Sequence, residues 1–167
     1  MTSQAIALQA GDGNTLGWRS LLVTDRSLAP LALRVTLAAV MLPHGVQKAF
    51  GWLGGHGWSG TMNFLTETMG LPMLIATGVI LLEVVGPLLL LVGLGTRAVA
   101  AGFVGLMIGA VATVHGSHGF FMNWSGGQTG EGFEYHLLLI GLALGLVFHG
   151  GGRASLDSRL TQRGSTS

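Results

Sequence analysis

Long apolar stretches alternate with short polar segments along most of this 167-residue chain. A hydrocarbon core of about 30 Å is crossed by about 20 helical residues, because each residue rises about 1.5 Å. The pattern therefore predicts an all-α, integral membrane four-helix bundle at residues 28–150. We expect the transmembrane helices, of which the last is the shortest, at about 28–50, 72–94, 98–115 and 133–149.

Glycine-rich segments separate these predicted spans. The break between the second and third spans, at 93–96, is so short that these two helices should form a close antiparallel hairpin. We expect residues 1–27 to form a cytoplasmic or interfacial segment without a signal peptide. Residues 151–167 should form a cytoplasmic tail, in which Ser155 caps a short polar helix.

The basic residues lie mostly on one side of such a four-span bundle. Lys48 alone falls on the other side, and the positive-inside rule therefore predicts that both termini are cytoplasmic. The expected location is the bacterial cytoplasmic (inner) membrane. The basic residues on the side of the termini are Arg19, Arg26, Arg34, Arg97, Arg153, Arg159 and Arg163.

The composition agrees with a membrane protein and excludes several functions. Hydrophobic residues make up 49% of the chain and charged residues 9%, against about 25% charged in soluble domains. The chain has no cysteine, which excludes thiol catalysis, disulfides and cysteine-held zinc or iron–sulfur sites. A net charge of +1 argues against a nucleic-acid partner, since phosphate binding needs a basic surface.

Six ionisable residues within or at the ends of the spans are candidates for lining a ligand pocket or carrying protons. A charge at the bilayer centre costs roughly 3 kcal/mol, so each needs a partner or a purpose. Glu83 lies deepest, and Pro87 leaves its backbone carbonyl without a helical donor, while Gly86 leaves room for a helix or a ligand. The candidates are Arg34, His44, Lys48, Glu83, His115 and Glu134.

Helix depth suggests how these groups pair. Lys48 and Glu134 both fall within about one turn of the outer boundary, so we predict an ion pair between them. Glu83 should be shared between Arg34 and His44. The alternative for these residues is a structural one, in which buried pairs fix the register of the helices and bind nothing.

Two weaker patterns remain. His115 and His118, with His44 or His136 as a third ligand, could hold a metal, but no spacing completes a recognised site and we predict none. Aromatic residues of the outer loops are typical of an interfacial belt, with quinone docking as the alternative. Small-xxx-small pairs in the third and fourth spans favour close packing, either within one chain or in a homo-oligomer.

Several short motifs, in their order along the chain, resemble the DoxX family of small bacterial membrane proteins. They cover about residues 28–160, and they are Arg34, Gly45-Val-Gln-Lys48, Glu83-Val-Val-Gly86, Gly93-Leu-Gly-Thr-Arg97, Gly132-Phe-Glu134 and Gly-Gly-Arg153-Ala-Ser-Leu-Asp157. The long segment before Leu28 and the histidine-rich outer face depart from the family.

The resemblance implies a four-helix membrane protein linked to redox chemistry, since relatives include subunits of thiosulfate:quinone oxidoreductase. We therefore expect a small membrane subunit that binds a quinone or small metabolite in a polar pocket. It should have no intrinsic cofactor, and its partners should be the lipid bilayer and other membrane or redox subunits. The alternatives are a structural or assembly subunit and a small proton-coupled transporter.

Overall fold

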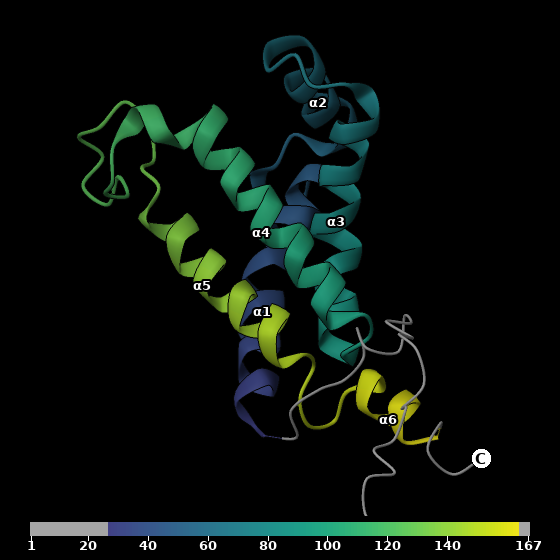
Figure 1. Ribbon diagram of the computed structural model, residues 1–167. Helices are drawn as coiled ribbons and strands as arrows, with labels where there is room; N and C mark the ends of the chain where they lie inside the picture. Colours follow the sequence, from purple (N-terminus) through teal and green to yellow (C-terminus); the bar gives the residue numbers. More distant parts are fainter. Residues whose placement is uncertain (1–26, 164–167) are drawn as a thin grey trace, which may run out of the picture.

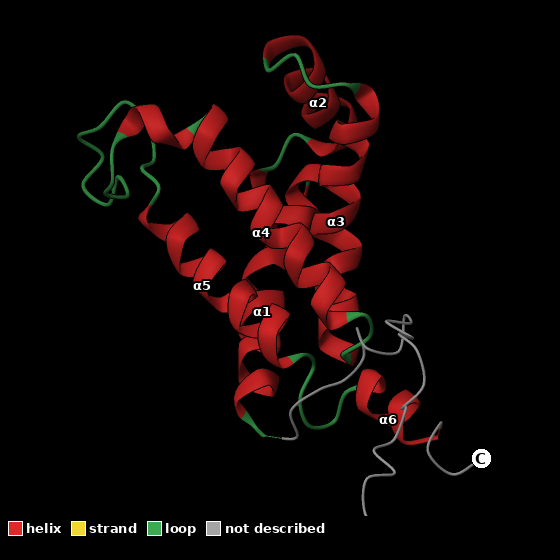
Figure 2. Ribbon diagram, viewed as in Figure 1, coloured by secondary structure: helices red, strands yellow, loops and turns green. Residues whose placement is uncertain are grey.

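The computed structural model describes residues 27–163, and within them every regular element is helical (Figures 1 and 2). The N-terminal segment predicted at 1–27 lies outside the described residues except for Ser27. The four long helices are α1 (Ala29–Phe50), α3 (Met73–Val92), α4 (Thr96–Thr113) and α5 (Glu134–His149). The short elements are η2 (Trp52–Gly54), α2 (Gly57–Asn63), η3 (Phe64–Thr68), η4 (His115–His118) and α6 (Leu156–Arg163).

Three of these helices, α1, α3 and α4, are long and apolar enough to cross a bilayer. The fourth, α5, is apolar but shorter, with 16 residues. Each long helix begins and ends within about two residues of its predicted bounds, because apolar runs ended by glycine or proline are local signals. The described chain is therefore an all-helical membrane protein with three candidate membrane-spanning helices.

The long helices associate as two pairs. α1 packs along α3, α4 packs along α5, and α1 also contacts α5. A tight turn joins α3 to α4, and Gly93 and Gly95 in it have positive φ of 68° and 61°, which glycine adopts without steric cost. From this turn α3 and α4 diverge toward the other end of the molecule (Figure 1).

The closest approach of α1 to α3 is at Gly45. A Cβ atom added there would overlap the backbone carbonyl of Glu83, so only glycine fits. This is the carbonyl that Pro87 leaves without a helical donor, and the structure buries it against the backbone of α1. The space beside Gly86 is occupied by the ring of Phe103 from α4, so it admits a helix and not a ligand.

One end of the bundle, which we call the basic end, holds the starts of α1 and α4, the ends of α3 and α5, and α6. Arg34 is 1% exposed there. Its guanidinium donates to the carbonyl oxygens of Leu90 at 2.9 Å, Leu91 at 2.6 Å, Arg153 at 3.2 Å and Ala154 at 2.8 Å. The predicted contact of Arg34 with Glu83 is therefore wrong. Carbonyls in the last turn of a helix lack their i+4 donor, so they can accept from a side chain. Leu90 accepts from the N–H of Gly93 at 3.1 Å as well as from Arg34.

A carboxylate closes the same end. Asp157 is 1% exposed and accepts hydrogen bonds from the backbone N–H of Gly95 at 2.7 Å and of Thr96 at 2.9 Å. These are N–H groups at the start of α4, which a carboxylate stabilises. Ser155 accepts from the N–H of Ser158 at 3.1 Å, which confirms it as the cap of α6. The tail predicted at 151–167 thus begins with residues packed into the bundle.

The predicted loop between the first two spans is largely helical. Gly51 and Gly57 turn the chain with positive φ of 74° and 67°, and α2 then contacts both α1 and α3. The hydroxyl of Thr61 donates to the carbonyl of Lys48 at 3.2 Å. The segment therefore folds back over the end of α1 that carries Lys48.

Candidate functional site

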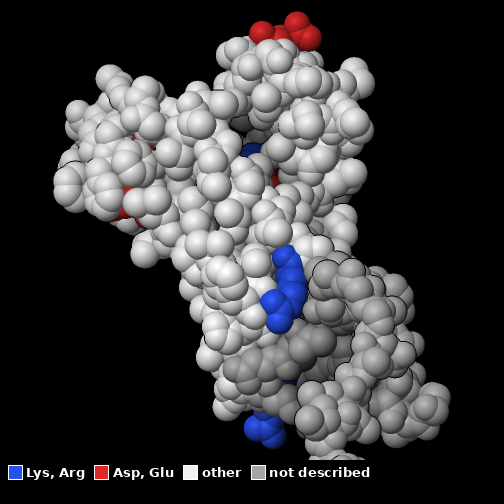
Figure 3. Space-filling view, viewed as in Figure 1, with Lys and Arg blue, Asp and Glu red and all other residues white. Residues whose placement is uncertain are grey.

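At the end opposite the basic end, a cavity of about 760 Å³ lies between α1, α3, α4 and α5. We call this the pocket end. The space-filling view shows the hollow, with basic and acidic atoms at its bottom (Figure 3). Most of the lining residues are apolar, and the volume is in the range of about 300–1,000 Å³ that is usual for small-molecule sites. The ionisable residues of the wall are His44, Lys48, Glu83, His115, Glu131, Tyr135 and His136.

An ion pair between α1 and α3 forms the most buried charged group of the cavity. The Nζ atom of Lys48 lies 2.6 Å from each carboxylate oxygen of Glu83. The Glu83 side chain is 3% exposed and the Lys48 side chain 35%, so the carboxylate is enclosed and the ammonium reaches the cavity surface. Pairing and hydrogen bonding are what make a charge tolerable at such a depth.

The predicted Lys48–Glu134 pair is wrong, because each residue has other partners. Glu134 lies at the start of α5 and accepts from the N–H of Met122 at 2.9 Å and from Nε1 of Trp124 at 3.1 Å. Glu134 therefore orders the loop before α5 and does not line the cavity. Of the six candidates, the structure brings His44, Lys48, Glu83 and His115 to one cavity and leaves Arg34 and Glu134 outside it.

The depth argument failed because the helices do not end at one level. At the level of the Gly45–Glu83 contact, ten residues of α3 but only five of α1 remain toward the pocket end. At about 1.5 Å per residue, α3 thus projects about 15 Å beyond the contact and α1 about 8 Å. Lys48 consequently faces the middle of α3, where Glu83 is.

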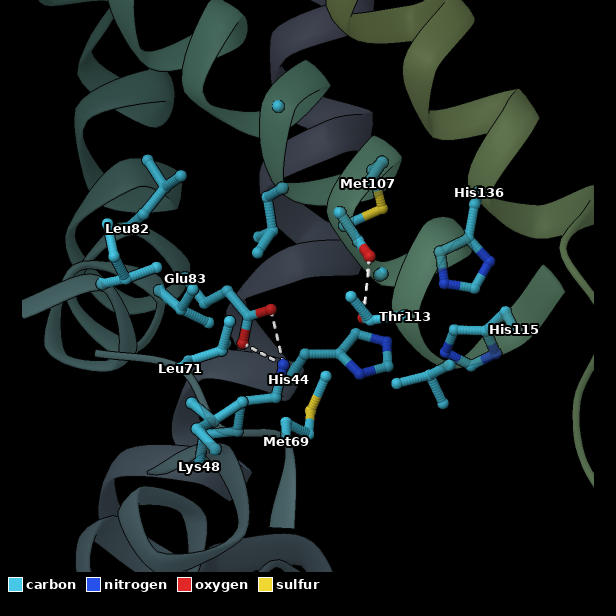
Figure 4. Close-up of a pocket in the computed structure, with 18 of the residues that line it drawn as sticks. His44, Lys48, Met69, Leu71, Leu82, Glu83, Met107, Thr113, His115 and His136 are labelled. Atoms are coloured by element: carbon cyan, nitrogen blue, oxygen red, sulfur yellow. Dashed lines mark hydrogen bonds and ion pairs between the residues drawn. The ribbon is translucent and has the colours of Figure 1, made fainter. Parts of the chain in front are cut away.

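Aromatic and imidazole side chains of α1, η4 and α5 form another wall of the cavity. The hydroxyl of Tyr135 lies 3.4 Å from Nε2 of His44, and the ring centroids of His115 and His136 are 4.1 Å apart. In the close-up, His44 lies between the Lys48–Glu83 pair and the rings of His115 and His136 (Figure 4). We call His44, Tyr135, His115 and His136 the imidazole wall.

Within the imidazole wall, His136 is the most enclosed residue. It is 6% exposed, and its Nδ1 atom makes no hydrogen bond within the described part of the chain. A buried polar atom without a partner is unusual in a folded protein, and it indicates a position where a ligand or water bonds. The sequence argument missed Tyr135 as a wall residue and named His136 only as a third metal ligand. The polar run Glu134-Tyr135-His136 at the start of an apolar helix was the available signal.

Among the described residues, no group of three or more His, Asp or Glu side chains is placed to hold a metal ion. The ring of His115 packs against that of His136 at a tilt of 40°, with its Nδ1 atom 2.9 Å from the carbonyl oxygen of Glu131. His118 lies instead near the hydroxyl of Thr129, at 3.5 Å. The two histidines of the weak metal pattern therefore do not converge.

Comparison with known proteins identifies the family. The profile of the DoxX family matches residues 29–116, which hold α1, α3 and α4. The chain is also similar to the protein named "Putative oxidoreductase CatD" of Bacillus subtilis (strain 168), with 32% identity over 120 residues. That match covers 72% of this chain and 79% of the relative. The chain belongs to the DoxX family. No solved structure matches it.

The DoxX profile covers part of the cavity wall and leaves part outside. His44, Lys48, Glu83 and His115 lie within the matched residues, whereas Tyr135 and His136 follow them. In chemical terms the wall offers an ammonium donor, two carboxylates, a phenol and several imidazoles in a largely apolar enclosure. Such a site suits a small ligand with hydrogen-bond acceptors on a flat or apolar body, and it can exchange protons with that ligand.

Proposed function

We propose that this DoxX-family protein is the membrane subunit of a quinone-linked redox system, and that its cavity binds the quinone headgroup. The observation that carries the proposal is the Lys48–Glu83 pair, enclosed between helices at the edge of a largely apolar cavity. Ionisable residues inside membrane bundles more often mark substrate or proton sites than packing. The name of the Bacillus subtilis relative supports a redox role.

The residues of the wall fit a quinone. A quinone ring has two carbonyl oxygens on opposite sides, and each accepts a hydrogen bond. The Lys48 ammonium can donate to one oxygen, and a protonated nitrogen of His136 can donate to the other. Apolar side chains such as Leu65, Met69 and Met107 then enclose the ring.

Reduction of a quinone to the quinol takes up two electrons and two protons. The Glu83 carboxyl and the imidazole wall can exchange the protons, since both line the same cavity. The electrons come from a two-electron donor on a partner protein. This chain contains no cysteine for an iron–sulfur cluster and no flavin or haem motif.

The proposed topology has four transmembrane helices and cytoplasmic termini in a bacterial inner membrane. In this arrangement α5 crosses with the other three long helices, and the pocket end faces away from the cytoplasm. Arg34, Arg97, Arg153 and Arg159 all belong to the basic end, and this distribution supports the orientation. Lys48 is the basic residue of the pocket end within 27–163.

A structural subunit is the second candidate, and one observation favours it. Lys48 and Glu83 already pair with each other, as a pair that only fixes helix register would. The two functions differ in what the purified protein retains. A structural subunit retains protein partners without quinone, whereas the proposed subunit retains both.

The test is to purify the full chain from its native membrane, identify co-purifying subunits and extract bound quinone for chromatography. We expect a stoichiometric quinone in the wild type and its loss in Lys48→Met, with the partners kept. Arg159→Met is the matched control, because this exposed cation lies on α6 away from the cavity. A protein with partners but no quinone would refute the proposal and support the structural subunit.

A further inference from the structure

We infer that the ligand is a membrane-dissolved molecule with a long apolar tail, which enters sideways between α3 and α4 and leaves its tail in that gap. The inference rests on the proposed function for the headgroup and adds the ligand class and the route. It separates an isoprenoid-type, tailed quinone from a water-soluble metabolite. The gap is lined by Gly78 and Leu82 of α3 and by Gly102, Gly105 and Gly109 of α4, and we call it the glycine groove.

The glycine groove is open along most of its length. A Cβ atom added at Gly78, Gly105 or Gly109 would meet no atom within 4 Å. At Gly102, by contrast, it would lie 3.1 Å from a methyl group of Leu82. The groove is therefore closed at the Leu82–Gly102 contact, in the middle of α3, and open from there toward the pocket end, where Gly78, Gly105 and Gly109 line the cavity. The helices α3 and α4 diverge in the same direction (Figure 1).

The open part lies at a depth where a bilayer holds hydrocarbon. Gly105 is nine residues from the start of α4 and eight from its end, which is about 12–14 Å from either. The neighbouring side chains are apolar and face outward, with Ile75 52% and Ile108 54% exposed. A molecule that enters by this route therefore comes from the lipid and not from water.

Glycines in a row would by themselves indicate only a packing surface. The groove differs because it is continuous with the cavity that holds Glu83 and His136. The Nδ1 atom of His136, buried and without a hydrogen bond in the described chain, gives a polar group for the headgroup to reach. A tail in the groove and a headgroup at the imidazole wall thus fit one elongated, amphipathic molecule.

A helix of a second copy is the rival occupant of the groove. The outward faces of α3 and α4 are apolar, with Leu81 and Leu88 about half exposed. Such a face would cover the glycines but would bring no polar group to His136. The continuity of groove and cavity therefore favours the tailed ligand.

The test compares two quinones on the full-length purified protein, a tritiated benzoquinone with a decyl tail and the same headgroup without a tail. Gly105→Leu and Gly109→Leu fill the groove, and neither added side chain meets a neighbour at its Cβ atom. We expect roughly tenfold weaker binding of the decyl quinone and unchanged binding of the tail-less headgroup. Gly141→Leu is the matched control, because this exposed glycine of α5 also has open space but lies outside the cavity.

The outcomes separate this inference from the proposed function. If Gly105→Leu weakens both quinones equally, or neither, the lateral route is refuted and quinone binding stands. If the wild type binds neither quinone, the proposed function is refuted, and a second measurement decides whether the groove faces lipid.

For this measurement a nitroxide label is attached to the Gly105→Cys variant, which has no other cysteine, and the labelled protein is reconstituted in phosphatidylcholine vesicles. More frequent collision with oxygen than with a water-soluble nickel complex supports a lipid-facing groove. More frequent collision with the nickel complex, or spin–spin broadening between labels on two copies of the chain, refutes it.

Discussion

The two ends of the bundle bury opposite charges between the same two helices and use them differently. Arg34 at the basic end spreads its guanidinium over four backbone carbonyls from α3 and the segment before α6. Glu83 at the pocket end meets a single, partly exposed ammonium and borders a cavity of about 760 Å³. A buried charge with many fixed backbone partners holds the fold together. A buried charge with one partly exposed partner beside a cavity leaves that partner within reach of a ligand.

The largest effect is expected from Arg34→Met. The variant removes the side-chain donor from the carbonyls of Leu90, Leu91, Arg153 and Ala154, and the free energy of unfolding should fall by about 3 kcal/mol. Unfolding in mixed detergent and dodecyl sulfate measures it.

Arg97→Met is the matched control for the basic end. Arg97 also donates to helix-terminal carbonyls, those of Val147 and Phe148 on α5, but at a more exposed position. Its loss should cost about 1 kcal/mol or less, because water can replace an exposed donor. Equal losses for the two arginines would contradict the view that burial makes Arg34 a clamp.

The next largest effect is expected at the α1–α3 contact. Gly45→Ala forces a Cβ atom against the Glu83 carbonyl, so the helices must separate, at a cost of about 2 kcal/mol. The thermal midpoint in detergent reports it. Gly141→Ala, where the added Cβ atom meets nothing, should be neutral or slightly stabilising, since alanine favours a helix over glycine by about 1 kcal/mol. If Gly45→Ala had the same thermal midpoint as the wild type, α1 and α3 would be shown to separate at little cost in free energy.

A smaller effect is expected for the coupling across the pocket-end pair. Lys48→Met and Glu83→Gln, singly and together, should give a coupling energy of about 1 kcal/mol in the free energy of unfolding. The same cycle with Lys48→Met and Glu134→Gln should be additive, because Glu134 bonds to Met122 and Trp124. Coupling in the second cycle and additivity in the first would reverse our assignment of the partners.

Much of this fold can be predicted from the sequence, because its strongest signals are local. The second span was expected at 72–94 and is Met73–Val92, since a run of apolar residues between Pro72 and Gly93 leaves little choice. The family resemblance was likewise carried by short motifs in order, and the DoxX profile confirms it. The segment at 51–71, in contrast, was expected to be a loop, because its many glycines conceal the three short helical elements η2, α2 and η3.

The partners of the charges could not be predicted in the same way. Spacing along α1 shows that Arg34 and Lys48 need partners, but it does not show how far α3 projects beyond α1. The sliding of one helix against the other is decided at Gly45, where a carbonyl freed by Pro87 meets a residue without a side chain. That contact brings Glu83 to Lys48 and leaves Arg34 to the end of α3.

The most direct test of the account is Glu83→Gln, measured for stability and for decyl-quinone binding in the same preparation. Glutamine keeps the shape and a hydrogen-bonding group, so the free energy of unfolding should change by less than about 1 kcal/mol. Binding, however, should weaken by at least about tenfold, because the charge that holds Lys48 in place is gone. The account predicts a folded protein that has lost its ligand. A variant that binds like the wild type, or one that fails to fold while Arg34→Met folds normally, would contradict it.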